Sequence, residues 1–442
     1  MLSPAISSKK LRPIQLVAII FLTVSAGPYG LEPLLTYVGR NGSLVLLILV
    51  PILWDIPAIL TVLELNSMMP VNGGYYQWVK RALGMRFAFF EGWWTWLYTF
   101  VDLAIYPVLF VEYASYFFPE IEAYKIPIGL FIIWSSAGLN ILGIVNVGKT
   151  AMMLSAIVLI PFVILFFVAF SQHAGSFSFP PLSLKGIGLS SLGLGLYTVM
   201  WNFIGWDNTT TYAEEVNRPI RSYFVSVIVA FILVFSVYFL AVITAQLSGI
   251  DLALLNENGF PALGRLIGGH WLGALIAGGG MASALGLYSA VLLSVSRVPQ
   301  VMAQDRLLPS KLTALHPKFG TPYISIIICS VIVSAMIFWT FADLLVIDVT
   351  LYGAGLFLEF ISLVVLRIKA PLEYRPFKIP LNKTGLCLMI LLPLGVYLLA
   401  LAGAFSTSGK SILPAIFAVA ALLSGEVAWH TVKFFSEPRF KD

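Results

Sequence analysis

Apolar stretches of about 20 residues recur along almost the whole chain, separated by short turns rich in glycine, proline or charge. A helix that crosses a bilayer needs about 20 predominantly apolar residues. Hydropathy and the turn signals together predict twelve spans. They cover residues 14–38, 43–65, 86–117, 126–143, 147–170, 190–214, 220–248, 271–301, 322–340, 342–367, 384–404 and 412–434. The pattern therefore predicts an all-α integral membrane protein with twelve transmembrane helices.

Composition supports this prediction and leaves little chain for a soluble domain. Hydrophobic residues make up 59% of the 442 residues and charged residues 11%, with a mean hydropathy of +0.93. Soluble domains carry roughly 25% charged residues. We expect a tail at 1–13, a first group of five spans at 14–170, a second at 190–367, two further spans at 384–434, and a tail at 435–442.

The positions of lysine and arginine predict the orientation. With the N-terminus inside, 21 of the 26 Lys and Arg residues fall on the inner side of the predicted spans and five on the outer side. This bias predicts that both termini are cytoplasmic. We also expect the protein to lie in the plasma membrane. The net charge of +5 then reflects orientation in the lipid bilayer, and we expect no nucleic-acid partner. No metal-ligand spacing exists among the histidines and cysteines, so we expect no metal and no cofactor.

The first span contains an unusual stretch, TVSAGPYGLEPLL (23–35), with Gly27, Pro28, Gly30 and then Glu32 in its middle. Proline removes a backbone donor and restricts its neighbour. Non-helical backbone at membrane depth is tolerated only where protein or a water-filled cavity satisfies the freed groups. Small residues can also serve close helix packing, but the combination with proline favours an interrupted helix.

The sixth span, GLYTVMWNFIGWDNTTTYAEEVNRP (195–219), has a similar interruption at Gly205, with Asp207 two residues later. Interrupted helices at matching places in two halves indicate a transporter site at a repeat interface. We therefore expect spans one to five and six to ten to form inverted repeats. The substrate-binding residues expected around the two interruptions are Gly27, Tyr29, Gly30, Glu32, Trp201, Gly205, Trp206 and Asp207.

Several carboxylates lie within the predicted spans, and no lysine or arginine lies at mid-depth to neutralise them. Buried acids are costly, so each is a candidate for cation binding or proton transfer. Helical spacing places Tyr98, Asp102, Tyr106 and Tyr113 on one face of the third span. A carboxylate among tyrosines suits an alkylammonium group, through ion pairing and cation–π contact. Packing in the core or against lipid is the better interpretation for Tyr98 and Tyr113.

Three segments resemble the amino acid–polyamine–organocation transporters: PVNGGYYQWVKRALG (70–84), AEEVNRP (213–219) and MAQDRLLPSKLTALHPKFGTP (302–322). Four more are similar to the polyamine-uptake branch of plants and microbes: SAGPYGLE (25–32), VDLAIYPVLFVEY (101–113), WNFIGWDNTTTYAEEV (201–216) and LFLEFISLVVLRIKAPLEYRPFKIP (356–380). The resemblance extends over residues 14–380. It implies a LeuT-like five-plus-five inverted repeat with broken helices one and six, and proton-coupled uptake.

Two departures from the amino acid permeases of this family bear on the substrate and the coupling ion. Their glycine–serine–glycine interruption, whose N–H groups hold a substrate carboxylate, is replaced by Gly27-Pro28-Tyr29-Gly30. A substrate with amines and no carboxylate fits better.

The lysine that some proton-driven relatives carry midway along span five is missing, with Ser155 and Ala156 nearby. We expect a carboxylate to couple transport to protons, with sodium as the alternative ion.

These observations predict a secondary transporter that imports polyamines, which are small organic cations. We expect Glu32, Asp102 and Asp207 to pair with ammonium groups, and Tyr106 and Trp206 to pack on the methylene chain. Glu32 or Glu359 would exchange protons. Glu214 and Glu215, near Arg218 and Arg221, are expected to form a gate or a salt bridge at a helix end.

An amino acid permease or exchanger, for cationic amino acids first, is the alternative, and a nutrient receptor derived from a transporter is a third possibility. A membrane enzyme is least favoured, because no catalytic constellation or soluble domain is apparent. Interrupted helices at one central site also favour an occluded pocket over the continuous pore of a channel.

Overall fold

The computed structural model describes residues 10–173, 181–337, 341–406 and 413–436. Parts of both predicted tails (1–9 and 437–442) and the ends of two predicted spans (338–340 and 412) lie outside the described residues. Within the described residues the chain is helical, with one isolated bridge between Leu11 and Val216 and no β-strand.

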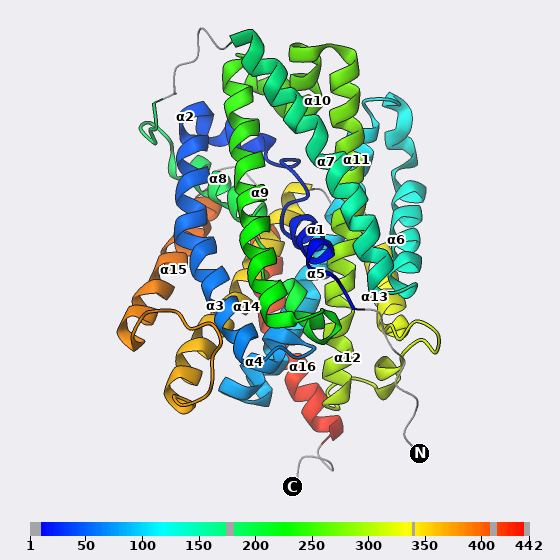
Figure 1. The fold of residues 1–442 in the computed structure, drawn as a ribbon, viewed down its shortest axis with the longest axis vertical. Helices are drawn as coiled ribbons and strands as arrows, with labels where there is room; N and C mark the ends of the chain where they lie inside the picture. Colours follow the sequence, from blue (N-terminus) through cyan, green and yellow to red (C-terminus); the bar gives the residue numbers. More distant parts are fainter. Residues whose placement is uncertain (1–9, 174–180, 338–340, 407–412, 437–442) are drawn as a thin grey trace.

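The helices stand side by side in a bundle (Figure 1). In chain order they are α1 (Pro13–Val24), α2 (Glu32–Val50), the π-helix η1 (Pro51–Asp55), α3 (Ile56–Met68), α4 (Gly74–Leu83), α5 (Met85–Ala114), η2 (Pro119–Tyr124), α6 (Lys125–Ile141), α7 (Ile144–His173), α8 (Leu189–Trp201), η4 (Asn208–Glu215), α9 (Pro219–Leu247), α10 (Leu252–Gly268), α11 (His270–Val295), α12 (Arg297–Gln304), η5 (Ser310–Thr313), α13 (Tyr323–Met336), α14 (Phe341–Lys369), α15 (Lys383–Phe405) and α16 (Leu413–Ser436). α12 and the end of α16 lie at one end of the bundle, here called the terminal face, and α10 lies at the other, the α10 face (Figure 1).

Seven helical segments within the described residues are long and apolar enough to cross a membrane. They are Glu32–Met68, Met85–Ala114, Ile144–Gln172, Pro219–Leu247, His270–Gln304, Asp348–Lys369 and Lys383–Gly403. Two of the shorter apolar helices, α1 and α8, precede the interruptions expected from the sequence. The all-helical membrane fold is thus confirmed, whereas the twelve crossings and the inverted repeat remain predictions.

Two helices of the structure fall between the spans expected from the sequence. α4 (Gly74–Leu83) is short and strongly amphipathic, and α10 (Leu252–Gly268) bends where Gly259 adopts φ +62°. The expected turn between the first two spans is a kink inside α2 at Gly39, where φ is +68°. Amphipathic helices lying along a bundle end lack the long apolar run that hydropathy detects.

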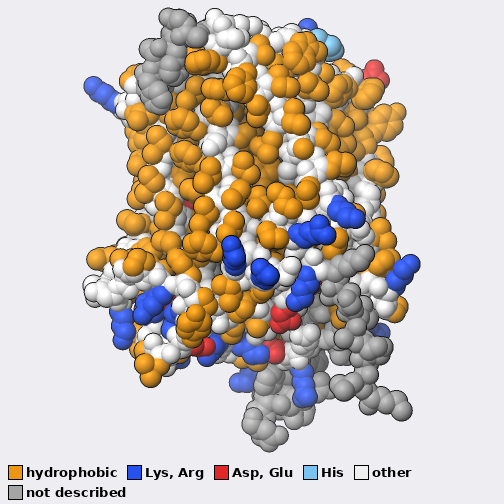
Figure 2. Space-filling view, viewed as in Figure 1, with side chains coloured by type: hydrophobic (Ala, Val, Ile, Leu, Met, Phe, Trp, Pro, Cys, Tyr) orange, Lys and Arg blue, Asp and Glu red, His pale blue; other side chains and the backbone are white. Residues whose placement is uncertain are grey.

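The sides of the bundle are apolar, and the basic residues gather towards the terminal face (Figure 2). Phe131 on α6, Phe167 on α7 and Leu423 on α16 are each at least 65% exposed. Continuous apolar surface of this extent is unfavourable in water. It is the surface expected of helices that contact lipid chains.

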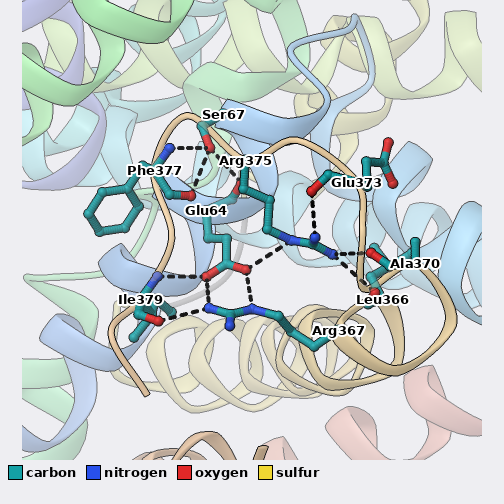
Figure 3. A network of polar contacts seen from close by, with 9 residues as sticks. All are labelled: Glu64, Ser67, Leu366, Arg367, Ala370, Glu373, Arg375, Phe377 and Ile379. Atoms are coloured by element: carbon teal, nitrogen blue, oxygen red, sulfur yellow. Dashed lines mark hydrogen bonds and ion pairs between the residues drawn. The ribbon is translucent and has the colours of Figure 1, made fainter. Parts of the chain in front are cut away.

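A buried ionic network ties the segment after α14 to α3 near the terminal face (Figure 3). Glu64 of α3 is fully buried, and its carboxylate meets Arg367 Nε at 2.5 Å and Arg375 Nε at 3.2 Å. The Ile379 N–H donates to the same carboxylate at 2.8 Å. Because a buried charge needs a partner, this network fixes the chain between α14 and α15 against α3.

Candidate functional site

The first expected interruption is present between α1 and α2. α1 ends at Val24 and α2 begins at Glu32. Between them Gly27 and Gly30 have φ values of +96° and +84°, a region that favours glycine. A Cβ on Gly27 would also lie 2.6 Å from Cγ1 of Val158. The two glycines therefore allow a backbone path that no helix could follow.

Nearby side chains satisfy the backbone freed by this interruption. The Gly27 N–H donates to Ser25 Oγ at 3.0 Å, and the Gly30 N–H donates to Glu32 Oε2 at 2.8 Å. The other Glu32 oxygen accepts from the Tyr113 hydroxyl at 2.8 Å and from the Phe260 N–H at 3.2 Å. The Glu32 carboxylate is thus engaged by three protein donors.

The second interruption, between α8 and η4, is stabilised in the same way. Gly205 has φ +97°, and its N–H donates to the Tyr352 hydroxyl at 3.2 Å. The Asn202 carbonyl accepts from Tyr238 Oη at 2.8 Å, and the Asn202 amide donates to the Gly30 carbonyl at 3.4 Å. Asn202 therefore joins the two interruptions directly, and protein groups replace the missing helical hydrogen bonds.

A small central chamber lies between the interruptions. Its volume is about 10 Å³, which is room for roughly one water molecule. Its lining comprises Thr23, Val24, Ser25, Tyr98, Asp102, Tyr106, Trp201, Asn202, Ile204, Gly205, Asn208, Leu287 and Tyr352. The structure thus shows the chamber closed around a space much smaller than an organic substrate.

Asp102 is the only charged side chain among the described residues that line the chamber. It is 5% exposed and accepts a hydrogen bond of 2.5 Å from the Tyr106 hydroxyl. The Trp201 side chain also donates towards this carboxylate. A negative group surrounded by aromatic rings attracts an organic cation by ion pairing and cation–π contact.

The structure brings part of the expected site together. Asp102, Tyr106, Trp201 and Gly205 line the chamber, and Tyr98 joins them. Six expected residues are not among the lining residues: Gly27, Tyr29, Gly30, Glu32, Trp206 and Asp207.

The aromatic side chains outside the chamber have other contacts. Tyr29 donates to the Ile276 carbonyl at 2.8 Å, so its ring packs between helices. Trp206 donates to Asp55 Oδ1 at 3.4 Å and is almost fully buried. In this structure its indole faces η1, and the expected packing of Trp206 on a substrate chain stays a prediction.

Glu32 also differs from expectation, because its oxygens bind the protein's own donors and do not face the chamber. The Tyr113 hydroxyl donates to Glu32 and not to Asp102, although Tyr113 and Asp102 lie on one face of α5. Which partner a long side chain meets depends on the neighbouring helices, and this information is absent from helical spacing alone.

Asp207 lies one hydrogen bond away from the chamber. It is 4% exposed and accepts from the Tyr352 hydroxyl at 2.9 Å. The carboxylates of Glu91 and Glu359 also lie close to Asp207, near enough for their negative charges to repel that of Asp207. Sequence reasoning missed Tyr352, although its place four residues after Asp348 and seven before Glu359 puts all three on one face of α14.

Larger hollows open at the two ends of the bundle. The hollow at the α10 face has a volume of about 690 Å³, and its charged lining residues are Glu112, Glu257, Arg265 and His270, the last charged only when protonated. Glu32 lies just beneath it, since Tyr113 and Gly259, which both contact Glu32, line this hollow.

The hollow at the terminal face has a volume of about 1080 Å³. Its charged lining residues are Lys10, Arg12, Lys149, Lys318 and Glu215. The single acid, Glu215, is already paired with Arg297 of α12 at 2.7 Å. The two hollows therefore differ in charge, and this one is strongly basic.

The two acids expected to form a gate or a salt bridge at a helix end differ in their contacts. Glu215 pairs with Arg297 and not with Arg218 or Arg221. Glu214 is exposed and contacts the Asn72 amide at 3.3 Å. Hydrogen bonds of 3.0 Å between Leu11 and the Glu215–Asn217 backbone join the start of α1 to the end of η4.

An apolar helical bundle with a central site at two interrupted helices is the arrangement of secondary membrane transporters. Residues 11–422 match the family model described as amino acid permease. The chain therefore belongs to this family, within the amino acid–polyamine–organocation superfamily. The family consists of transporters and not of enzymes.

Similar proteins include plant transporters. A probable polyamine transporter of Arabidopsis thaliana is 33% identical over 400 residues, which cover 87% of this chain and 81% of the relative. The polyamine transporter RMV1 of the same plant is 32% identical over 389 residues, covering 87% and 79%. The polyamine transporter PUT1 of Oryza sativa subsp. japonica is 30% identical over 443 residues, covering 98% and 80%.

Proposed function

We propose that this protein imports polyamines such as putrescine or spermidine by alternating access, coupled to protons. The observation that carries the proposal is the occupation of the N–H groups at the first interruption. Gly27 and Gly30 donate to Ser25 and Glu32, and Pro28 has no N–H. A substrate carboxylate therefore cannot use the Gly27 or Gly30 N–H, whereas Asp102 offers an amine a negative partner.

The lining of the chamber supports a cationic substrate. Asp102 has no lysine or arginine partner among the described residues, and an ammonium group would supply the missing positive charge. Tyr98, Tyr106 and Trp201 provide ring faces for the ammonium and its methylene chain. The names of the plant relatives agree with this substrate class.

The charges of the two hollows support inward movement. The acids at the α10-face hollow attract a polycation, and the basic lining at the terminal face favours its release. If the terminal face is cytoplasmic, as the excess of basic residues there favours, an inside-negative potential contributes about 2.3 kcal/mol per charge per 100 mV. We propose that both termini are cytoplasmic and that the membrane is the plasma membrane.

The proposed architecture has twelve spans in a LeuT-like five-plus-five inverted repeat, with α15 and α16 outside it. Opening would separate α1 and η4 from α12, which requires breaking the Glu215–Arg297 pair. The proton-coupling candidates are Glu32, Glu214 and Glu359. Sodium remains the alternative coupling ion, and replacing sodium by choline in a transport assay separates the two.

The proposal is tested by uptake of radiolabelled putrescine into proteoliposomes that contain the purified protein. We expect spermidine to compete and arginine to compete poorly, because only arginine must bury a carboxylate. Asp102→Asn should raise the KM for putrescine at least tenfold, since charged hydrogen-bonding partners contribute about 1.5–3 kcal/mol. The matched control is Asp55→Asn, another fully buried acid, which lies outside the chamber lining and should leave the KM unchanged.

Equal competition by arginine and putrescine would replace the proposal by a cationic amino acid permease or exchanger. Absence of any amine accumulation, with retained binding, would favour a nutrient receptor.

A further inference from the structure

Three buried carboxylates meet between the chamber and the terminal face: Glu91 of α5, Asp207 and Glu359 of α14, here called the acidic cluster. All three are at most 4% exposed, and Glu359 is fully buried. Each lies within electrostatic range of the other two. Gly355 of α14 permits this approach, because a Cβ there would lie 3.0 Å from Glu91 Oε1.

The cluster is distinct from the substrate chamber. Glu91 and Asp102 are eleven residues apart on α5, and Asp348 and Glu359 are eleven apart on α14, a rise of about 16 Å in each helix. Asp348 lies near Asp102 at the level of the chamber. The two helices therefore carry acids at two levels, one beside the substrate and one nearer the terminal face.

No cation compensates the acidic cluster among the described residues. The groups that face it are Tyr75 of α4, Thr95 and Tyr98 of α5, Tyr223 of α9 and Tyr352 of α14. None of these carries a positive charge, and no ion pair involves the three acids. The described residues also contain no acid or histidine group arranged to hold a metal ion.

Several oxygens of the cluster receive no hydrogen bond from a donor group of the protein. Both Glu359 oxygens and Glu91 Oε2 are buried without a donor. Three ionised carboxylates packed together without water or a cation would be very unfavourable. A proton on Glu359 removes one charge and converts the acid into a donor, with Asp207 beside it as acceptor.

Tyr352 connects the cluster to the chamber. Its hydroxyl donates to Asp207 at 2.9 Å and accepts from the Gly205 N–H at the second interruption. Its ring lines the chamber and packs edge-on against Tyr98, with centroids 5.4 Å apart. A change of charge at Asp207 therefore acts directly on the interrupted backbone and on the substrate site.

We propose that the acidic cluster is the proton-binding site of the transporter and that Glu359 takes up and releases the coupled proton. Uptake forms one O–H bond on the Glu359 carboxylate, and release returns the proton to water. Because Asp102 binds the amine and Glu359 the proton, both can be occupied together, as import of proton and substrate in the same direction requires. This inference rests on the proposed function and specifies its coupling site.

Two transport modes measured on the same proteoliposomes test this inference. Counterflow of radiolabelled putrescine needs substrate binding and alternating access but no proton gradient. Accumulation driven by an acidic exterior, with the membrane potential clamped to zero, needs proton coupling. For the wild-type protein we expect both counterflow and accumulation. With one coupled proton, each pH unit of gradient should raise the ratio of internal to external putrescine about tenfold.

Glu359→Gln should retain counterflow and lose the gradient-driven accumulation. Glu373→Gln is the control, because Glu373 pairs with Arg81 near the surface and should change neither mode. Accumulation by Glu359→Gln equal to that of the wild type would overturn the inference while leaving polyamine transport intact. Absence of counterflow in the wild type would instead overturn the proposed function.

Glu359→Asp decides the case in which Glu359→Gln also loses counterflow. Recovery of counterflow and accumulation by the aspartate variant would support the inference, because the ionisable group and not the side-chain shape is then required. Loss of counterflow in both variants would assign Glu359 to the fold and overturn the inference.

Discussion

At the scale of single residues, buried acids in this protein differ in what their oxygens contact. Glu32 accepts three hydrogen bonds from the protein, Asp102 accepts from Tyr106 and faces the chamber, and neither Glu359 oxygen has a donor, since its neighbour is the Asp207 carboxylate. An acid whose acceptors are all engaged stabilises the backbone, whereas an acid with a free oxygen is available to a ligand or a proton. Burial alone does not separate these roles.

Glu32→Gln tests the structural role of this acid. The NH₂ group of the new glutamine replaces one carboxylate oxygen and therefore faces a donor, either the Gly30 N–H or the pair formed by Tyr113 and Phe260. We expect a loss of about 1–3 kcal/mol in the free energy of unfolding, with little change in the KM for putrescine. Thermal unfolding in detergent and uptake assays measure the two effects. A large rise in KM with unchanged stability would instead make Glu32 a substrate ligand.

At the scale of elements, the two interruptions decide where the chamber lies. Each combines a glycine at positive φ with hydrogen bonds to side chains, which are the local Ser25 and Glu32 at the first interruption and Tyr238 and Tyr352 of distant helices at the second. Sequence reasoning located both interruptions because glycine and proline act on the local backbone. It did not identify Tyr238 or Tyr352 as their partners, because these residues come from other helices.

Gly205→Ala tests the need for this backbone conformation. A residue with a Cβ in the left-handed region costs about 1–2 kcal/mol, and the added Cβ would lie 3.1 Å from Asn208 Nδ2. We expect reduced stability and a strong loss of putrescine uptake. Gly278→Ala in α11 is the matched control, because no atom lies within 4 Å of its Cβ position. Equal uptake by both variants would contradict a role for the interruption at Gly205.

At the scale of the whole molecule, ionic contacts near the terminal face join distant parts of the chain. The Glu64 network ties the segment after α14 to α3 (Figure 3), and Glu215–Arg297 joins the end of η4 to α12. The first contact is fully buried and has three partners, so it belongs to the fixed frame. The second borders the hollow at the terminal face, where a transport cycle must open.

Glu64→Ala tests the buried network. The substitution leaves Arg367 and Arg375 buried without their carboxylate, and breaking a buried ion pair costs about 3–5 kcal/mol. We expect a marked fall in the temperature of unfolding in detergent. Glu373→Ala, which removes the more exposed pair with Arg81, should cost at most about 1 kcal/mol. Similar small shifts for both variants would show that the network does not stabilise the frame.

The sequence by itself determined the membrane-spanning helices, the two interruptions and the excess of buried acids. Hydropathy, proline chemistry and the absence of nearby lysine or arginine are local properties, and each can be read along the chain. Only the tertiary structure decided that Asp102 faces the chamber, that Glu32 binds its own backbone and that Trp206 faces Asp55. It also decided that Glu91, Asp207 and Glu359 converge. These contacts depend on how the helices pack and rotate against one another, and side-chain periodicity within one helix does not contain that information.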